Sequence, residues 1–326
     1  MLGITPRPDI MNVHKLALAA GFTAVLTTVG ASALLVAQAG RGTPPTPVPP
    51  PNAAALIARA KVLARTDLLE EYQSLCEPTP ATIAVRQDRS PGVLEPVKVF
   101  DNLYFVGKNS VSATALKTSA GLILIDTLSN DEEASTILVP GLRQLGLDPK
   151  DIKYVVSTHA HGDHMGGIKY LRANFPGFRV VMPEADWAAD ATKALRTPID
   201  IGFDQEMKLT LGDYTMTLIK TPGHTIGTVS LLYPIQYQGQ THMVWQWGGG
   251  QPHDPAFSQE VVDFFLAKAR AASVAVRWQS HTKPDTRGML AKYKAGQGHP
   301  FIFGPEKMGR YMDIIATCKR AGVDAK

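Results

Sequence analysis

Positions 157–167, STHAHGDHMGG, constrain the fold of this chain more than any other stretch. They begin within the apolar segment IKYVVST at 152–158, whose length and β-branched residues predict a buried strand. A segment that we predict to be helical follows, from residue 166 to about residue 175. A strand, a polar turn and a helix in this order predict an α/β unit, with the turn at the end of a sheet.

The side chains of this turn are of the kinds that bind metal ions. His159, His161, Asp163 and His164 lie within six positions. His159 and His161 are two residues apart, so they project in similar directions from an extended segment. Imidazole suits zinc, and a carboxylate adds an anionic ligand. The following glycine pair lets the backbone pack closely beside the site. The pattern predicts a metal site and disfavours the alternative, a solvated histidine-rich loop.

The rest of the chain mixes strand and helix patterns. Strand-rich segments are predicted at 97–107, 112–127, 179–182, 228–235, 242–249 and 274–281, and a hairpin at 207–224 around Gly212-Asp213. Helices are predicted at 55–75, 130–146, 258–272 and 304–322. This order predicts an α/β fold in which two sheets pack together, with helices outside and loops at one rim.

The first 52 residues are not expected to belong to this fold. Lys15 precedes a long apolar run of small residues that ends in Ala37-Gln38-Ala39. This pattern predicts a signal peptide over 1–39, cleaved after Ala39, and hence an exported, periplasmic protein. A retained membrane anchor is the alternative, because the run could nearly span a bilayer. Residues 40–52 are proline-rich and predict an extended linker. A helical arm at 53–94 and the main domain at 95–326 would follow.

Composition narrows the classes of partner. The net charge of +4 is spread along the 326 residues without a basic block, which argues against a nucleic-acid partner. We expect a small-molecule substrate and no stable membrane partner, and the oligomeric state stays open. Cys76 and Cys318 are the two cysteines of the chain. In an exported protein an even number of cysteines favours a disulfide, with two buried free thiols as the alternative.

Three motifs resemble those of the metallo-β-lactamase superfamily. HAHGDH at 159–164 is similar to its H-x-H-x-D-H signature, and TPGHTIGTVS at 221–230 is similar to its second motif. QSH, ending at His281, resembles the third motif. The motifs occur in the family's order, each at a predicted strand end, within about residues 95–320. The resemblance implies a four-layer αβ/βα metallo-β-lactamase sandwich with zinc at its rim.

The resemblance also implies a ligand set for two Zn²⁺ ions with a hydroxide between them. The first ion would take His159, His161 and His224, and the second would take Asp163, His164 and His281. Asp163 would also act as a catalytic residue by orienting the water. A set without a cysteine ligand resembles the third subclass of the class B β-lactamases. The other histidines are interpreted as ordinary: His14, His242, His253 and His299.

Substrate-related positions are less distinctive. Glyoxalase-like and lactonase-like members of the family place a bridging aspartate after the next strand, where this chain has glycines in VWQWGGGQ at 244–251. Asp254 follows too late to be expected as a bridge, which favours the lactamase-like branch. By resemblance, Thr228 and Ser230 would hold a substrate carboxylate, although both also suit ordinary strand positions. Lys283 is either a further carboxylate anchor or a solvated lysine.

Two further residues lie beside the glycine-rich stretch. Trp245 and Trp247 alternate along the strand and are expected to pack in the core, with a wall of the substrate site as the alternative.

These observations predict a class B, β-lactamase-like metallo-hydrolase that opens a β-lactam ring by means of a zinc-bridging hydroxide. A dizinc hydrolase of another lactone, ester or amide is the first alternative, because the metal chemistry is the same. A non-catalytic zinc-binding scaffold is the second. The complete ligand set argues against the scaffold, which has no need of two metal sites.

Overall fold

The computed structural model describes residues 50–80, 83–84, 92–252 and 254–323. The predicted signal peptide at 1–39, most of the linker at 40–52, and the histidines at 14 and 253 lie outside this part of the chain. Within it, no helix combines the length and the hydropathy needed to cross a bilayer.

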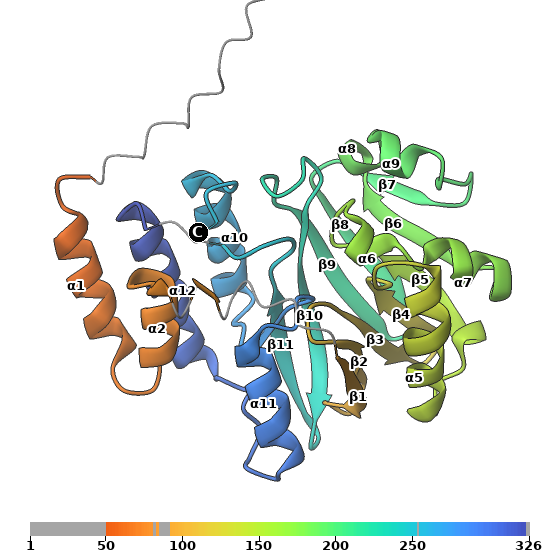
Figure 1. The fold of residues 1–326 in the computed structure, drawn as a ribbon, viewed down its shortest axis with the longest axis horizontal. Coiled ribbons are helices and arrows are strands. Elements are labelled where there is room, and N and C mark those ends of the chain that lie inside the picture. Colours follow the sequence, from red (N-terminus) through yellow and green to blue (C-terminus); the bar gives the residue numbers. More distant parts are fainter. Residues whose placement is uncertain (1–49, 81–82, 85–91, 253, 324–326) are drawn as a thin grey trace, which may run out of the picture. The chain divides into compact units, whose positions relative to one another are not determined.

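The described strands form two sheets (Figure 1). The first sheet has the sequential order β1 (Val93–Lys98), β2 (Leu103–Lys108), β3 (Ser112–Thr118), β4 (Gly121–Ile125), β5 (Ile152–Val156), β6 (Arg179–Pro183) and β7 (Ile201–Phe203). Its pairs are antiparallel from β1 to β4 and parallel from β4 to β7. The carboxyl ends of β4 to β7 therefore share one edge, at which the loop carrying the first motif begins.

The second sheet has the order β12-β11-β10-β9-β8. Its strands are β8 (Glu206–Leu211), β9 (Tyr214–Lys220), β10 (Val229–Tyr237), β11 (Gln240–Gln246) and β12 (Val276–Trp278). Only the β11–β12 pair is parallel. The second motif lies between β9 and β10, and His281 follows β12.

Three apolar clusters separate four layers, because successive residues of a strand face opposite sides of its sheet. Phe105, Val156 and Leu231 belong to the cluster between the sheets. The outer side of the first sheet packs on a helix layer, and the outer side of the second sheet packs on another. Figure 1 shows these helices outside the two sheets. The predicted αβ/βα sandwich is confirmed.

The helices of the two outer layers differ in length. Those on the first sheet are α4 (Asp131–Glu133), η1 (Ala134–Leu138), α5 (Val139–Gln144), α6 (Gly162–Met165), α7 (Ile168–Asn174), α8 (Glu184–Trp187) and α9 (Asp190–Lys193), with the short η2 (Pro149–Asp151) before β5. α10 (Gln259–Ala271) and α12 (Pro305–Arg320) cover the second sheet, and α11 (Pro284–Lys294) follows β12.

The arm packs on this second helix layer. The predicted helix at 55–75 is two helices, α1 (Ala53–Ala64) and α2 (Leu69–Cys76), because Arg65 adopts a left-handed φ of 49° and interrupts it. The Arg310 guanidinium donates to both carboxylate oxygens of Asp67 (2.9 and 2.7 Å). Cys76 and Cys318 lie within disulfide-bonding distance, with Cα atoms 5.3 Å apart.

Several predicted bounds change in the structure. The helix predicted at 130–146 comprises α4, the π-helical η1 and α5, and Gly146 follows its end with φ of 72°. The helix predicted from residue 166 to about residue 175 is α7, and the unpredicted α6 precedes it. The short α8, α9 and β7 were not predicted, because three or four residues show no periodicity.

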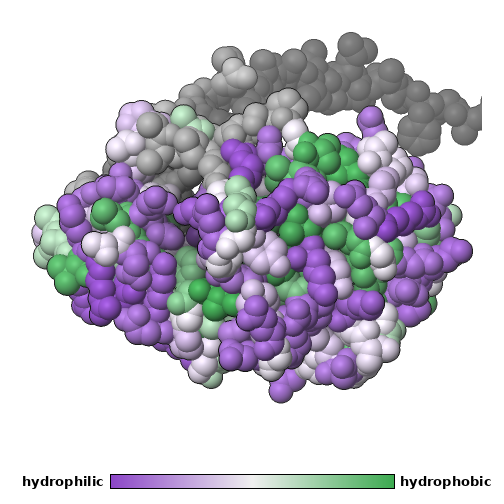
Figure 2. All heavy atoms as spheres, turned by 90° about the horizontal axis from the view of Figure 1, so that it is seen from below, coloured by the Kyte–Doolittle hydropathy of each residue, from purple (hydrophilic) through white to green (hydrophobic). Residues whose placement is uncertain are grey.

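Figure 2 shows one face of the described surface, on which apolar residues appear as separate patches among hydrophilic ones. Exposed apolar side chains of the described chain include Ile226, which is 70% exposed and lies two residues beyond His224.

Candidate metal centre

Hydrogen bonds between the two sheets bring the three motif loops together. The backbone N–H of Val229, at the start of β10, donates to the carbonyl of Thr158 (2.8 Å). This bond joins the chain just before His159 to the end of the second motif. Ser112 N–H donates to the carbonyl of Ser280 (2.8 Å), which fixes the residue before His281 against β3. Contacts between sheets thus position all three motifs at one rim.

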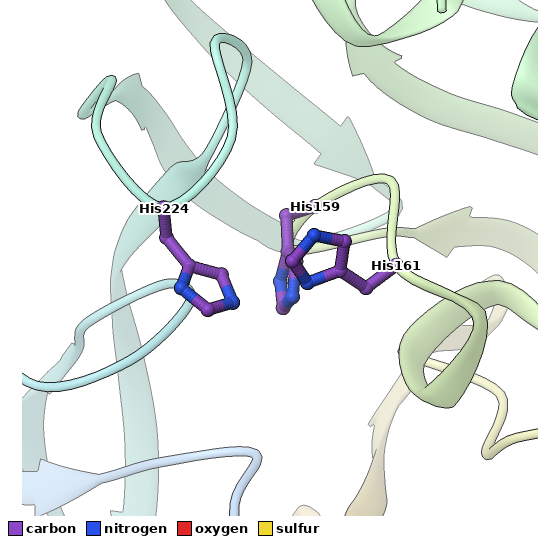
Figure 3. A group of neighbouring side chains, drawn as sticks. All are labelled: His159, His161 and His224. Carbon is purple, nitrogen blue, oxygen red and sulfur yellow. The ribbon is translucent and has the colours of Figure 1, made fainter. Parts of the chain in front are cut away.

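The first predicted ligand group converges in space. Ligand atoms of His159, His161 and His224 all lie within 4.8 Å of one another. Figure 3 shows the rings of His159 and His161 on one loop and that of His224 on another, facing a common space. His159 is fully buried, and its Nε2 has no hydrogen-bond partner in the described structure. A buried nitrogen without a partner is costly unless a metal ion takes its lone pair, so the group fits a metal.

The second predicted group adjoins the first. His164 Nε2 lies 3.4 Å from Asp163 Oδ2 and 3.2 Å from His281 Nε2. Ligand atoms of His159, Asp163 and His164 also lie within 4.8 Å of one another. The ring centroids of His159 and His164 are 4.0 Å apart. The six residues that the sequence predicted as zinc ligands are therefore gathered in one place, as two adjoining groups.

Residues outside the motifs determine which ring nitrogen of His164 and of His281 is available to a metal ion. Asp126, fully buried after β4, accepts a hydrogen bond from His164 Nδ1 (2.8 Å). Its other oxygen accepts from the Thr158 N–H (2.8 Å). His281 Nδ1 donates to the carbonyl of Ser110 (3.2 Å). Both histidines thus keep the Nε2 lone pair for a metal, as second partners usually arrange.

Asp126 was missed in the sequence. Its only signal is an acidic residue at the end of an apolar strand, followed by a threonine. Its φ of 62° is left-handed, which places the carboxylate beneath the first motif loop. Aspartate tolerates this conformation better than most residues do.

The pKa values of the second group reflect mutual contacts in the metal-free protein. Burial by itself lowers the pKa of His164. The negative charges of Asp126 and Asp163, and the hydrogen bonds that His164 makes to them, outweigh burial and raise this pKa to about 9. Burial and the charges of His164 and Lys283 lower the pKa of His281 to about 3. Burial opposes ionisation of Asp163, yet its hydrogen bond with His164 brings its pKa below the usual range. The group thus pairs an ionised carboxylate with a protonated histidine whose proton a metal ion would displace.

Two histidines of the first group, His159 and His224, are shifted towards the neutral form instead. Burial, together with the charges of the neighbouring histidines, lowers the pKa of His159 well below its ordinary value. Burial and the charge of His161 lower the pKa of His224, against a smaller opposing effect of Asp254. Neutral imidazoles are the form that binds zinc.

Steric contacts explain why glycines follow β11. A Cβ atom at Gly248 would lie 1.8 Å from the carbonyl oxygen of Val229. Gly249 has a left-handed φ of 74°, and a Cβ there would lie 2.7 Å from the Cβ of His224. No aspartate fits at either position without displacing the second motif. Asp254 belongs to neither ligand group among the described residues, and its Oδ1 accepts from the N–H of Ala256 (2.9 Å).

Thr228 and Ser230 are fully buried and have partners inside the protein. Thr228 Oγ1 accepts from the N–H of Thr225 (2.7 Å). Ser230 Oγ contacts Thr221 Oγ1 (2.8 Å) and accepts from the N–H of Gly248 (3.1 Å). These bonds shape the second motif loop. The substrate-binding role of both hydroxyls stays a prediction.

The other residues singled out in the sequence lie as follows. Trp245 and Trp247 are buried in the cluster beneath α10 and α12, as expected for core residues. Lys283 is half-buried at the start of α11, close enough to His281 to affect its pKa. His242 lies on β11, away from both ligand groups, and His299 Nε2 donates to the carbonyl of Val99 (2.9 Å).

Comparison with known proteins agrees with this geometry. A family model described as "Metallo-beta-lactamase superfamily" matches residues 106–236. The chain is 26% identical to BJP-1, a subclass B3 metallo-β-lactamase of Bradyrhizobium japonicum, with a TM-score of 0.55 over 68% of this chain and 90% of that one. The chain carries a metallo-β-lactamase domain. The resemblance inferred from its three motifs is confirmed.

Other relatives of this metallo-β-lactamase domain differ in activity. FEZ-1 of Legionella gormanii, another metallo-β-lactamase, shares the fold at 18% identity and a TM-score of 0.54, over 69% of this chain and 94% of that one. A hydroxyacylglutathione hydrolase of Hahella chejuensis is 29% identical over 32% of this chain and 39% of that protein. An N-acyl homoserine lactonase of a Bacillus species is 28% identical over 38% of this chain and 58% of that protein. The chain spans about half the length of the curated relatives it matches. The superfamily is one of metal-binding hydrolases, and the relatives do not agree on one substrate.

Proposed function

We propose that this protein is an exported, dizinc hydrolase that opens β-lactam rings. The observation that carries the proposal is the convergence of six ligand-type residues from three loops into two adjoining groups. The likeness to a subclass B3 enzyme along nine-tenths of its length supports the lactam substrate. The predicted signal peptide and the pairing of Cys76 with Cys318 support export.

The residues present suit two zinc ions. His159, His161 and His224 would hold the first, and Asp163, His164 and His281 would hold the second. When bound there, zinc would supply a nucleophilic water at neutral pH and polarise the carbonyl that is attacked. The ionised Asp163 would accept a hydrogen bond from that water and orient it. Asp126 and Ser110 would keep His164 and His281 in their binding tautomers.

Two residues beside the ligands suit a β-lactam substrate. Lys283 places a cation near His281, where it would attract the carboxylate that β-lactam antibiotics carry. Ile226, exposed in the loop after His224, would offer apolar contact to a substrate side chain. We assign these two contacts to binding rather than to chemistry.

A lactone, ester or thioester substrate is the second candidate. The curated relatives favour it, since one is named a lactonase and another a hydroxyacylglutathione hydrolase. The steric exclusion of an aspartate at Gly248 and Gly249 argues against a lactonase-type bridge. A scaffold without turnover is the third candidate, and its prediction is full zinc occupancy with no hydrolysis.

One panel of hydrolysis assays separates these candidates. Zinc-loaded protein would be tested with a penicillin, a cephalosporin, a carbapenem, an acyl homoserine lactone and a glutathione thioester. We expect hydrolysis of at least one β-lactam, weak or narrow in range, that a chelator abolishes and serine-directed inhibitors do not affect. Cleavage of the lactone or thioester alone would replace the lactam proposal, and no cleavage by fully zinc-loaded protein would favour the scaffold.

Asp163→Asn tests the mechanism within the same assay. The amide keeps the size of the side chain but is a weaker ligand and a poorer acceptor for water. We expect kcat to fall by about 100-fold or more, with a much smaller change in KM. Asp148→Asn is the matched control, because Asp148 is an exposed cap of η2 at the opposite end of β5. A kcat that falls equally in both variants would refute a specific role for Asp163.

A further inference from the structure

A buried carboxylate joins the two loops that carry the first ligand group. Asp186 lies on α8 and is 2% exposed. Its Oδ2 accepts from the N–H of Ala160 (2.9 Å) and from the hydroxyl of Thr225 (2.8 Å). Its Oδ1 accepts from the N–H of Gly227 (2.8 Å). One side chain thus receives three hydrogen bonds, and all three donors lie in the motif loops.

These donors lie beside the histidines of the first ligand group in the sequence. Ala160 stands between His159 and His161, and Thr225 directly follows His224. The carboxylate therefore connects the segment that carries two of the histidines to the segment that carries the third. The backbone bond from Val229 to Thr158 links the same two segments, but it lies outside the histidines. Asp186 is the link that lies among them.

The carboxylate itself is rigidly held. The indole N–H of Trp187, the next residue, donates to the carbonyl of Ile201 (3.1 Å). The hydroxyl of Thr192 donates to the carbonyl of Asp186. These contacts fix α8 against β7 and α9. The Asp186 carboxylate therefore has a fixed position against which the two loops are held.

Gly227 packs directly against the Asp186 side chain, and a larger residue would not fit at position 227. A Cβ atom at Gly227 would lie 2.6 Å from Cγ of Asp186 and 2.7 Å from its Oδ1. The second motif loop therefore packs directly on the carboxylate. The second glycine of the PGHTIGT stretch, Gly227, thus serves the contact with Asp186.

We propose that Asp186 is a positioning residue that sets the distance between His224 and the pair His159–His161, and so sets the affinity of the first metal position. The inference rests on the proposed zinc chemistry of the site. Within the described part of the chain, Asp186 forms no hydrogen bond to any of the six ligands, and it acts through the backbone and the hydroxyl of the loops. Without it, the hydrogen bond from Val229 to Thr158 still joins the two segments, but the three imidazoles lose their fixed separation.

Zinc binding to Asp186→Asn tests the inference without any substrate. The amide has nearly the same shape, but its NH₂ group would face an N–H or hydroxyl donor in place of an acceptor. Zinc content would be measured by dialysis against chelator-buffered zinc of known free concentration. We expect the affinity of one of the two zinc ions to weaken about 10-fold or more, the loss usual for partners that orient ligands. The other ion should bind as in the wild type.

Asp200→Asn is the matched control. Asp200 is also a buried aspartate with several donors, from the N–H of Val180 (2.8 Å) and of Thr197 (2.7 Å) and from Arg172. It lies at the amino end of β6, whereas the metal loops leave the carboxyl ends of the strands. Its variant should lower the thermal unfolding midpoint of the metal-free protein and leave both zinc affinities unchanged.

Each outcome decides the inference. Equal zinc affinities in wild type and Asp186→Asn, or an equal loss in Asp186→Asn and Asp200→Asn, would overturn it and leave the proposed function intact. If Asp186→Asn does not fold, Thr225→Val removes one of the three hydrogen bonds and should weaken the same zinc ion by a smaller factor. Unchanged zinc binding in Thr225→Val would then refute the inference. A wild-type protein that binds no zinc would overturn both proposals.

Discussion

His164 is prepared for metal binding by residues that no motif contains. Asp126, which lies 38 positions earlier, holds its Nδ1, and Thr158 links the same carboxylate to the first motif loop. His281 depends in the same way on a carbonyl 171 positions earlier, in the loop before β3. The motifs supply the proposed ligand atoms, and distant partners orient them. The metal position each ligand serves should therefore be separable by mutation.

Single alanine substitutions should remove the two metal ions separately. His159→Ala removes a ligand of the first group, and His281→Ala removes one of the second group. We expect wild-type protein to bind close to two zinc ions per chain, His159→Ala to lose the first and His281→Ala to bind the second more weakly. Elemental analysis at controlled free zinc would measure this. His242→Ala, on β11, is the control and should keep both ions. Wild-type protein without zinc would contradict the ligand assignment.

At the scale of elements, the arm and the last helix form one unit. α1 and α2 pack against α12, and Leu68, Tyr72 and Ile315 share one apolar cluster. Arg310 of α12 reaches across to Asp67 and to the carbonyl of Leu63. The Cys76–Cys318 pair closes the same contact across 242 residues of sequence. Two predictions concern this attachment.

The first concerns the cysteine pair. A cross-link over so long a loop removes conformational freedom from the unfolded chain, worth about 5 kcal/mol as an upper value. We expect mass spectrometry of exported protein to find one disulfide and no alkylatable thiol. The double variant Cys76→Ser, Cys318→Ser should lose a few kcal/mol of unfolding free energy, about 2–4 by comparison with other disulfides. Two thiols in unreduced, denatured protein would rule the bond out.

The second concerns the acid stability of the arm. The hydrogen bonds from Arg310 are the main cause of the lowered pKa of Asp67, which stands below its ordinary value of 3.8. A folded-state pKa below the unfolded one stabilises the fold above the unfolded pKa, and this contribution is lost as the pH falls through the folded pKa. In metal-free protein, the difference in unfolding free energy between wild type and Asp67→Asn should stay constant from about pH 7 to 5 and shrink below about pH 4. A difference that grows on acidification would contradict the ion pair.

At the scale of the whole molecule, the proposed metal ligands come from both sheets. His159 and His164 follow β5 of the first sheet, whereas His224 and His281 follow strands of the second. Zinc would therefore tie the two sheets together at the rim. Binding to the native state alone adds to the unfolding free energy, by about 2.7 kcal/mol at a ligand concentration 100 times Kd.

Zinc should therefore raise the thermal midpoint of the whole domain. We expect calorimetry to show one transition that moves to higher temperature with zinc and back after chelation. Magnesium, which prefers oxygen ligands, should have little effect at the same concentration. A midpoint indifferent to zinc would mean that the two sheets are not bridged by the metal.

Much of this protein could be derived from its sequence by itself. Apolar periodicity is a property of near neighbours, so it located most long helices and strands, and it indicated two sheets with helices outside. The resemblance of its three motifs to those of a known superfamily implied the six side chains that the structure gathers. The even cysteine count favoured a pairing that the structure brings within bonding distance.

Only the tertiary structure determined the contacts between residues that lie far apart in the chain. Asp126 and Asp186 have no local pattern, because their roles depend on donors that the fold brings to them from other loops. α8, which carries Asp186, is too short to show periodicity. The burial of Thr228 and Ser230, and the close approach of Gly249 to His224, likewise follow from the packing of β10 and β11. Sequence spacing indicates which side chains are available for a site, and only packing determines which atoms meet.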